Sequence, residues 1–148
     1  MNAPPDRRTL LADAGLRVIA TQGARGLTHR AIDREANVPL GTTSNYFRSR
    51  EALLGALGNR IFERFAPDPE VLTRLAERPP SVELYVDYVR YIVERTMREP
   101  ELTRALLELR LEAGRHPDLA SALRQTLQRG YRDDVAFHAE SGLPGGAF

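Results

Sequence analysis

The sequence predicts an all-α protein made of a helical head, residues 1–66, and a helical body, residues 67–148. Two observations lead to this prediction. Apolar residues recur every three or four positions in successive segments, which is the spacing of the buried side of a helix. Residues that start or stop helices stand between these segments, mainly Ser and Thr caps, Gly and Pro. With 42% hydrophobic and 28% charged residues, the chain has an ordinary globular composition.

A first helix is expected from about residue 6, where Asp6 is a plausible cap, to about residue 22. Gly23 should end it, because Gly adopts the left-handed conformation without steric cost. Arg7 and Arg8 at its start either remain solvated or reach phosphate. Residues 1–5 are expected to form a disordered tail. The buried stripe of this helix consists of Leu11, Ala14, Gly15, Val18 and Ile19.

Residues 27–54, LTHRAIDREANVPLGTTSNYFRSREALL, indicate two short helices joined by a tight turn. Thr28 is a good N-cap for the first helix. Asn37 can close it, because Asn tolerates the left-handed conformation better than most residues. Pro39 is expected to start the second helix, which then covers residues 40–47. This pattern is a helix-turn-helix.

The second of these helices carries no charged residue between positions 39 and 47, unlike most helices that face water. Short polar side chains on such a helix can reach base edges in the major groove of DNA. Basic residues on both sides are suited to phosphate contacts. They are His29, Arg30 and Arg34 before the turn and Arg48 and Arg50 after the helix. The alternative is an ordinary helical hairpin, and these features favour DNA binding over it.

Residues 10–57 resemble the DNA-binding domain of the TetR family of bacterial transcriptional repressors, over about a third of the chain. The matching segments are LLADAGLRVIATQG, GLTHRAIDREANV and GTTSNYFRSREALL. Two positions differ from the usual pattern. Asn37 stands where the family usually has Gly, and Leu40 stands where a basic residue is common.

The resemblance implies a dimeric repressor that binds palindromic double-stranded DNA and responds to a small molecule. Arg30, Arg34, Tyr46 and Arg50 would then hold phosphates. The bases would be read by Thr42, Thr43 and Asn45. The full set expected at the DNA is Thr28, His29, Arg30, Arg34, Pro39, Leu40, Gly41, Thr42, Thr43, Ser44, Asn45, Tyr46 and Arg50.

Ser49 is expected to cap a linking helix over about residues 50–65, and the sequence APDP at 66–69 separates head from body. Its inner face would consist of Leu53, Leu54, Leu57, Ile61, Phe62 and Phe65. The first 65 residues carry 10 arginines and 6 acidic residues, and the rest of the chain carries 11 and 14. This asymmetry fits a DNA-binding head on a body that does not bind DNA.

The body is expected to contain four helices, over about residues 70–77, 81–99, 100–114 and 119–139, the last ended by SGLPGG. In the second, the apolar face would be Leu84, Tyr85, Tyr88, Val89, Tyr91, Ile92 and Val93. In the third, the inward residues would be Leu102, Leu106, Leu107, Leu109 and Leu111. Against the usual length of the family, either its last helix is absent here or the sequence is a fragment of a longer product. In the first case the last helix could supply a smaller dimer interface, through Leu119, Leu123, Leu127, Tyr131 and Val135.

A small-molecule pocket is implied in the body by the resemblance. The candidate pocket residues are Phe62, Tyr85, Tyr88, Tyr91, Arg95, Met97 and Arg110. Alternatively, the tyrosines are core or interface residues with their hydroxyls at the rim, and the body only mediates dimerisation or other interactions without an inducer.

An enzyme is not expected, and neither is a cofactor. The chain has no cysteine, which excludes disulfides and thiolate chemistry. Its histidines, His29, His116 and His138, are scattered, and it has no metal-ligand cluster, nucleophile motif or Gly-rich phosphate loop. It also has no signal-peptide pattern or membrane-spanning run, so a cytoplasmic location is expected.

Overall fold

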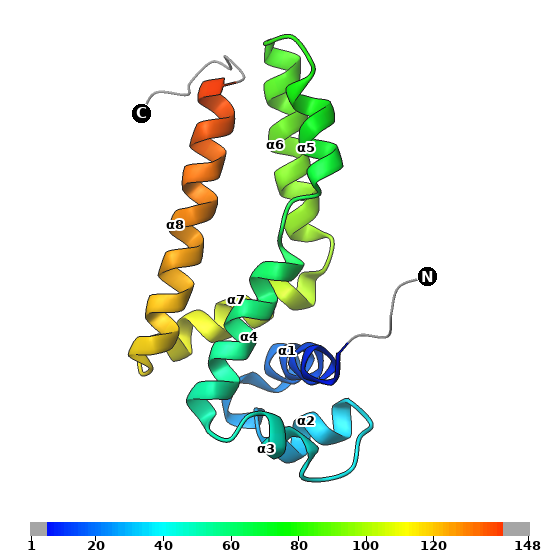
Figure 1. The fold of residues 1–148 in the computed structure, drawn as a ribbon, viewed down its shortest axis with the longest axis vertical. Helices are drawn as coiled ribbons and strands as arrows, with labels where there is room; N and C mark the ends of the chain where they lie inside the picture. Colours follow the sequence, from blue (N-terminus) through cyan, green and yellow to red (C-terminus); the bar gives the residue numbers. More distant parts are fainter. Residues whose placement is uncertain (1–5, 141–148) are drawn as a thin grey trace. The chain divides into compact units, whose positions relative to one another are not determined.

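The computed structural model describes residues 6–140, which form eight α-helices and no strand (Figure 1). The all-α prediction is confirmed. The described residues divide into two compact units. The first unit consists of the residues up to Arg64 and of Pro100–Leu123, and the second consists of Phe65–Glu99 and the residues from Arg124 on. The expected tail (residues 1–5) and the expected SGLPGG stop lie outside the described residues.

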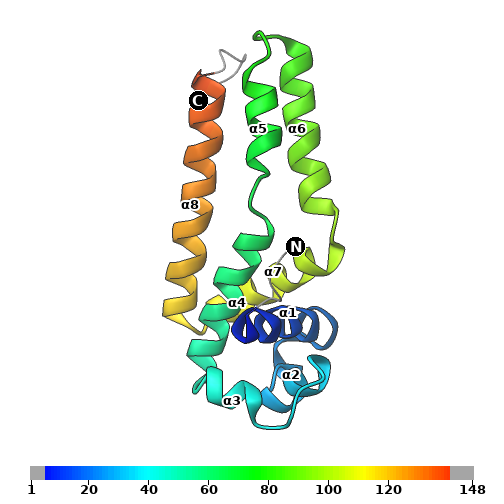
Figure 2. The same cartoon turned by 45° about the vertical axis from the view of Figure 1, so that its right-hand side comes forward.

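The first unit is organised around its first helix, which packs against α2, α4 and α7 (Figure 2). Its core contains Leu11, Leu16, Ile19, Ile32, Phe47, Leu54, Leu57, Ile61 and Leu109. The predicted division at residue 66 assigns α7 to the body, whereas the contacts of α7 group it with the first unit. The helices of this unit are α1 (Arg7–Gly26), α2 (His29–Glu35), α3 (Thr42–Tyr46), α4 (Arg50–Arg64), α7 (Pro100–Ala113) and the first turns of α8 (Pro117–Glu140).

Two glycines shape α1. Gly15 allows α4 to approach closely, because an added Cβ would lie 2.7 Å from Cδ2 of Leu57. Gly23 has a φ of 67° and interrupts the helical geometry, but α1 continues to Gly26 instead of ending at Gly23 as predicted. The predicted buried stripe of α1 is confirmed, since Leu11, Ala14, Gly15, Val18 and Ile19 are all buried.

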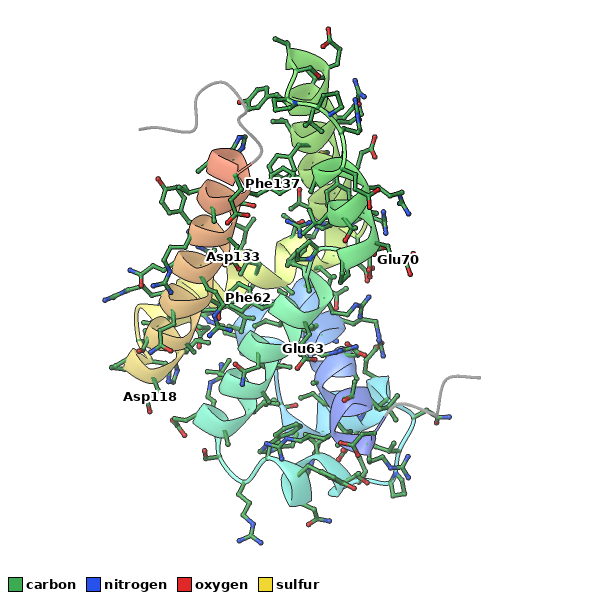
Figure 3. The ribbon with its side chains drawn as sticks, turned by 45° about the horizontal axis from the view of Figure 1, so that its top comes forward. Phe62, Glu63, Glu70, Asp118, Asp133 and Phe137 are labelled. Carbon is green, nitrogen blue, oxygen red and sulfur yellow. The ribbon has the colours of Figure 1, made fainter. Side chains whose placement is uncertain are left out.

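Ion pairs also connect α1 to α4. Both carboxylate oxygens of Asp13 accept hydrogen bonds from Arg60, at 2.8 and 3.0 Å, and Arg64 donates to the same carboxylate at 3.1 Å. Partial burial raises the pKa of Asp13, but the two guanidinium groups outweigh it and leave the pKa below its ordinary value. Figure 3 shows Phe62 and Glu63 on the last turns of the same helix, where Glu63 accepts from Arg60 at 2.9 Å.

The second unit contains α5 (Pro69–Ala76), α6 (Val82–Met97) and α8 from Arg124 on. Helix caps set the starts of α5 and α6: Asp68 accepts from the amide of Glu70 at 2.9 Å, and Ser81 accepts from that of Leu84 at 3.1 Å. The core of this unit is small, with Leu75, Leu84 and Tyr88 buried. Partly buried residues packed against this core are Val71, Leu72, Tyr91, Ile92 and Phe137.

Several residues that were expected inside are exposed. On α7, Leu107 is 54% exposed and Leu111 is 69% exposed, because the buried stripe of this helix is narrow. That stripe consists of Leu102, Ala105, Leu109 and Glu112. On α6, the exposed members of the predicted apolar face are Tyr85, Val89 and Val93. None of the described helices combines the length and the apolar character needed to cross a membrane.

Candidate nucleic-acid interface

The helix-turn-helix begins at Thr28, whose hydroxyl oxygen accepts a hydrogen bond from the amide of Ala31 at 3.1 Å. This confirms the predicted N-cap of α2. Asn37 has a φ of 52°, which confirms the predicted left-handed turn. Its amide donates to the carbonyl of Arg34, and the amide of Val38 donates to that of Asp33, so the chain reverses directly after α2.

The second helix of the motif, α3, begins later than predicted. Pro39 and Leu40 lie in the turn, and Gly41 precedes the helix with a φ of 93°. The prediction of a helix over residues 40–47 was wrong, because the chain needs Gly41 in a conformation that only Gly adopts readily. The carbonyl of Pro39 accepts from the amide of Thr42 at 3.1 Å and from its hydroxyl at 2.6 Å.

The start of α3 is held by a residue that the sequence analysis did not identify. Gly41 has no side chain to cap the helix, and the carboxylate of Asp33 on α2 takes that role. It accepts from the amides of Gly41 at 2.7 Å and Thr43 at 2.8 Å, and from the hydroxyl of Thr43 at 2.5 Å. Asp33 and Thr43 are both fully buried. Burial raises the pKa of Asp33, but the hydrogen bonds from Thr43 and Gly41 together lower it below its ordinary value.

This arrangement corrects the role predicted for Thr43. Its side chain faces the protein interior, where its hydroxyl is used by Asp33, so it does not lie on the surface that could meet a base. On the outer side of α3, Ser44, Asn45 and Tyr46 are exposed. The Ser44 hydroxyl donates to the carbonyl of Gly41 at 2.8 Å, which leaves Asn45 as the exposed amide of this helix.

Arg50 also has a different role from the predicted phosphate contact. Its guanidinium donates to the carbonyls of Ala24 at 3.0 Å and Leu27 at 3.2 Å, and to the carboxylate of Glu112 at 3.2 Å. Glu112 is 7% exposed and accepts a further hydrogen bond from Arg115. Burial raises its pKa, but the two arginines outweigh this effect and lower it. Arg50 therefore connects the start of α4 to α7.

Three other arginines are exposed around the motif. Arg30 and Arg34 lie on α2 and Arg48 follows α3, and none of them pairs with a carboxylate within residues 6–140. Leu40, in the turn, is 67% exposed. His29 is half-buried, and its Nε2 has no hydrogen-bond partner in the described part of the chain. The result is an uncharged helix face with arginines on both sides that have no carboxylate partner in the part of the chain that the structure describes.

Arg8 supports α3 from the other end. Its guanidinium donates to the carbonyl of Tyr46 at 3.3 Å and lies 4.7 Å from the ring centre of Phe47. A cation at this position is favourable because the carbonyls at a helix C-terminus carry partial negative charge. Phe47 is fully buried, whereas Tyr46 is 40% exposed.

The candidate pocket residues are divided between the two units. Phe62 and Arg110 belong to the first unit, and Tyr85, Tyr88, Tyr91, Arg95 and Met97 belong to the second. The hydroxyl of Tyr88 donates to Asp134 at 2.6 Å, and its ring stacks on Phe137 with 4.4 Å between centres. In Figure 3, Phe137 extends from the second-unit part of α8.

The hydroxyl groups of two tyrosines on α6, Tyr88 and Tyr91, have partners within the protein. Burial, followed by the hydrogen bond to Asp134, raises the pKa of Tyr88. The Tyr91 oxygen accepts from the amide of Asp68 at 2.7 Å, and the Arg95 guanidinium lies 5.5 Å from the Tyr91 ring. Both hydroxyls are thus used within the protein, which agrees with the alternative view of these tyrosines as core and rim residues.

Two family models match the chain. One describes bacterial regulatory proteins of the tetR family and matches residues 11–57. The other describes the tetracyclin repressor-like C-terminal domain and matches residues 80–148. The chain belongs to the TetR family. Its match to a family of regulatory proteins agrees with the expectation that it is not an enzyme.

Curated relatives match about half of the chain. An uncharacterised HTH-type transcriptional regulator of Xanthobacter autotrophicus is 35% identical over 53% of this chain and 35% of its own length. The HTH-type transcriptional regulator BetI of Rhizobium meliloti is 36% identical over 51% of this chain and 37% of its own length. The matched stretch thus spans about a third of the length of these relatives.

Solved structures match most of the chain. The multidrug binding protein EbrR complexed with imidazole has a TM-score of 0.67 and 28% identity, over 93% of this chain and 73% of that one. EbrR complexed with proflavin has a TM-score of 0.54 at 28% identity, over 83% and 71%. A transcriptional regulator from Rhodococcus sp. Rha1 shares the fold at 18% identity, with a TM-score of 0.64 over 90% and 70%.

Proposed function

We propose that this TetR-family chain is a sequence-specific transcriptional regulator that binds double-stranded DNA through α2 and α3. The observation that carries the proposal is the uncharged outer face of α3, beside which Arg30, Arg34 and Arg48 are exposed and have no carboxylate partner among residues 6–140. Short polar side chains on a helix suit base edges in the major groove, and cations beside it suit phosphates. We assign the DNA-binding domain to residues 1–66 and the regulatory domain to residues 67–148.

Within this proposal, Asn45 reads bases, because its exposed amide can donate and accept at once. Ser44 adds a shorter contact on the same face. Arg30, Arg34 and Arg48 hold phosphates, and the exposed hydroxyl of Tyr46 donates to another. These contacts come from α2, α3 and the loop that follows α3. The contacts to bases would lie in the major groove, and the contacts to phosphates would lie along its edges.

The proposal extends to a homodimer on a palindromic site in the cytoplasm. Two recognition helices reach successive major grooves only when two copies bind together. Leu119 and Leu123 are buried against Gly58 within the first unit, so they are not available for the interface expected from the sequence. The exposed residues left on α8 for a second copy are Leu127, Tyr131 and Val135.

We further propose that the regulator is a repressor released from DNA by a small aromatic molecule. The support is similarity to EbrR, which was solved with imidazole and with proflavin. The competing function is a body that only mediates dimerisation. The internal use of the Tyr88 and Tyr91 hydroxyls favours that alternative, since these groups have partners without a ligand.

DNA binding is tested by selecting duplexes from a randomised pool and measuring affinity by fluorescence anisotropy. Asn45→Ala should reduce the preference for the selected duplex over a scrambled one, since each good base contact contributes ~1–3 kcal/mol of discrimination. Arg34→Ala should weaken binding to both duplexes alike. Arg104→Ala, an exposed change on α7, is the matched control. If the parent chain selects no sequence, the proposed function is wrong.

The effector proposal needs a separate measurement. Proflavin fluorescence should change on binding, and saturating proflavin should lower the anisotropy of a labelled selected duplex. No binding of proflavin, or binding that leaves the DNA affinity unchanged, would support the dimerisation-only body instead.

A further inference from the structure

Asp33 is buried beneath the outer face of α3 rather than exposed on it. We propose that Asp33 is a positioning residue that sets the orientation of α3, and through it the sequence preference of the protein, without contacting DNA. The inference rests on the proposed DNA-binding function and extends it to a residue outside the interface.

The shortness of α3 makes an external support necessary. The helix has five residues, and its N-cap Gly41 offers no side-chain acceptor. Isolated helices of this length are unstable in water, because the first turn fixes several dihedrals for one hydrogen bond. The Asp33 carboxylate supplies acceptors for two amides at the start of the helix, those of Gly41 and Thr43. These amides would otherwise be without partners.

The contact also sets which residues face outward. Thr43 is held by Asp33 through both its amide and its hydroxyl. Successive residues in an α-helix are turned by about 100° around the axis. With Thr43 fixed on the inner side, Ser44 and Asn45 are therefore directed to the outer side. A rotation of α3 by one position would exchange the residues presented to a base.

The charge of Asp33 is unfavourable for DNA binding as such. A carboxylate near the interface repels phosphates and lowers the affinity for every sequence. This cost predicts an unusual signature for the neutral variant Asp33→Asn. Its preference for the selected duplex should fall, while its affinity for a scrambled duplex should stay the same or rise. Unfolding of the DNA-binding head would instead lower the affinity for both duplexes. The experiment therefore distinguishes a changed orientation of α3 from a loss of folding.

In Asp33→Asn the side chain keeps its shape, but its NH2 group replaces one of the two carboxylate oxygens. This NH2 group faces a backbone N–H donor, so one of the hydrogen bonds at the start of α3 is lost. The matched pair Thr43→Val and Thr43→Ser removes or keeps the hydroxyl that Asp33 accepts. Glu35→Gln is the charge control, because it neutralises an exposed carboxylate on the same helix.

The experiment measures the ratio of affinities for a duplex selected by the parent and a scrambled duplex of equal length, at several salt concentrations. We expect Asp33→Asn to lower this ratio roughly ten- to a hundredfold, the range for a lost hydrogen bond to a charged group. Thr43→Val should lower it by up to about tenfold. Thr43→Ser and Glu35→Gln should keep the parental ratio.

Circular dichroism and a thermal melt report whether each variant is folded. If Asp33→Asn is folded and keeps the parental ratio of affinities, including the case of equal losses on both duplexes, the inference is overturned. Asn45→Ala still tests the proposed function in that case. If Asp33→Asn does not fold, equal ratios for Thr43→Val and Thr43→Ser overturn it. A parent without sequence preference overturns the proposed function and this inference together.

Discussion

Replacing Arg50 by Ala should destabilise the protein rather than remove a phosphate contact. The guanidinium makes hydrogen bonds to two backbone carbonyls and to Glu112. A hydrogen bond with a charged partner contributes ~1.5–3 kcal/mol, but the 39% exposure of this side chain reduces the value through solvent screening. Glu112 also keeps its bond to Arg115 in the variant. We therefore expect a total loss of about 2 kcal/mol.

For a chain of this length, 1 kcal/mol corresponds to a shift of roughly 2–4 °C in Tm, so Arg50→Ala should lower Tm by about 4–8 °C. The matched control is Arg48→Ala, which removes an exposed arginine two residues earlier. It should change stability by less than about 0.5 kcal/mol. Thermal unfolding followed by circular dichroism measures both values.

Salt dependence separates the two roles further. Each phosphate contact adds about 0.9 to the slope of log affinity against log salt concentration. Arg48→Ala should therefore reduce the slope by roughly one. Arg50→Ala should leave the slope unchanged at a temperature where the variant is folded. A smaller slope for Arg50→Ala without a loss of stability would refute this assignment.

Three further predictions concern other parts of the chain. Asp13 and Asp33 have lowered pKa values, so the stability they contribute is complete above their ordinary value of 3.8 and is lost as pH falls below it. The urea concentration at the midpoint of unfolding should therefore decrease as the pH is lowered below about 4, and this decrease should be less steep in Asp33→Asn than in the parent. Tyr88→Phe keeps its ring but loses the bond to Asp134, and should lower the urea-derived unfolding free energy by ~1 kcal/mol. Tyr131→Glu, on the exposed side of α8, should shift the proposed dimer toward monomer in light scattering without changing helix content.

Helix ends could be predicted from the sequence because they depend on near neighbours. Thr28, Ser49 and Ser81 each accept the amide hydrogen bond that their sequence position predicts. Asn37 adopts the expected positive φ. All of these interactions lie within a few residues, so the local pattern contains the information needed.

Contacts between distant residues could not be predicted in the same way. Asp33 and Thr43 are ten positions apart, and Arg50 and Glu112 are 62 positions apart. The available signal for Asp33 was its position beside Ile32, on the apolar side of a short helix whose successor lacks a capping side chain. An aspartate in such a helix is more often exposed. Only the fold shows that this one is buried and accepts hydrogen bonds from the amides of Gly41 and Thr43.

Periodicity also failed where apolar residues occupy more than one side of a helix. On α7, Leu109 is fully buried, whereas Leu107, two positions before it, is 54% exposed. The pattern identified the helix and could not identify which side meets α1. The same ambiguity applies to the predicted face of α6, where Tyr88 is buried and Tyr85 is exposed.

The arginines of the first unit show how burial limits a prediction based on charge alone. Ten arginines precede residue 66, but some of them already have protein partners. These are Arg8, Arg17, Arg50, Arg60 and Arg64. An arginine that must first break such a contact gains less from a phosphate. Of the five arginines that remain, Arg30, Arg34 and Arg48 lie on α2 or directly after α3, so the DNA contacts should fall to these three. This predicts a salt slope of about 3 for each chain bound. A slope near nine would mean that the partnered arginines are released on DNA and that the head rearranges when it binds.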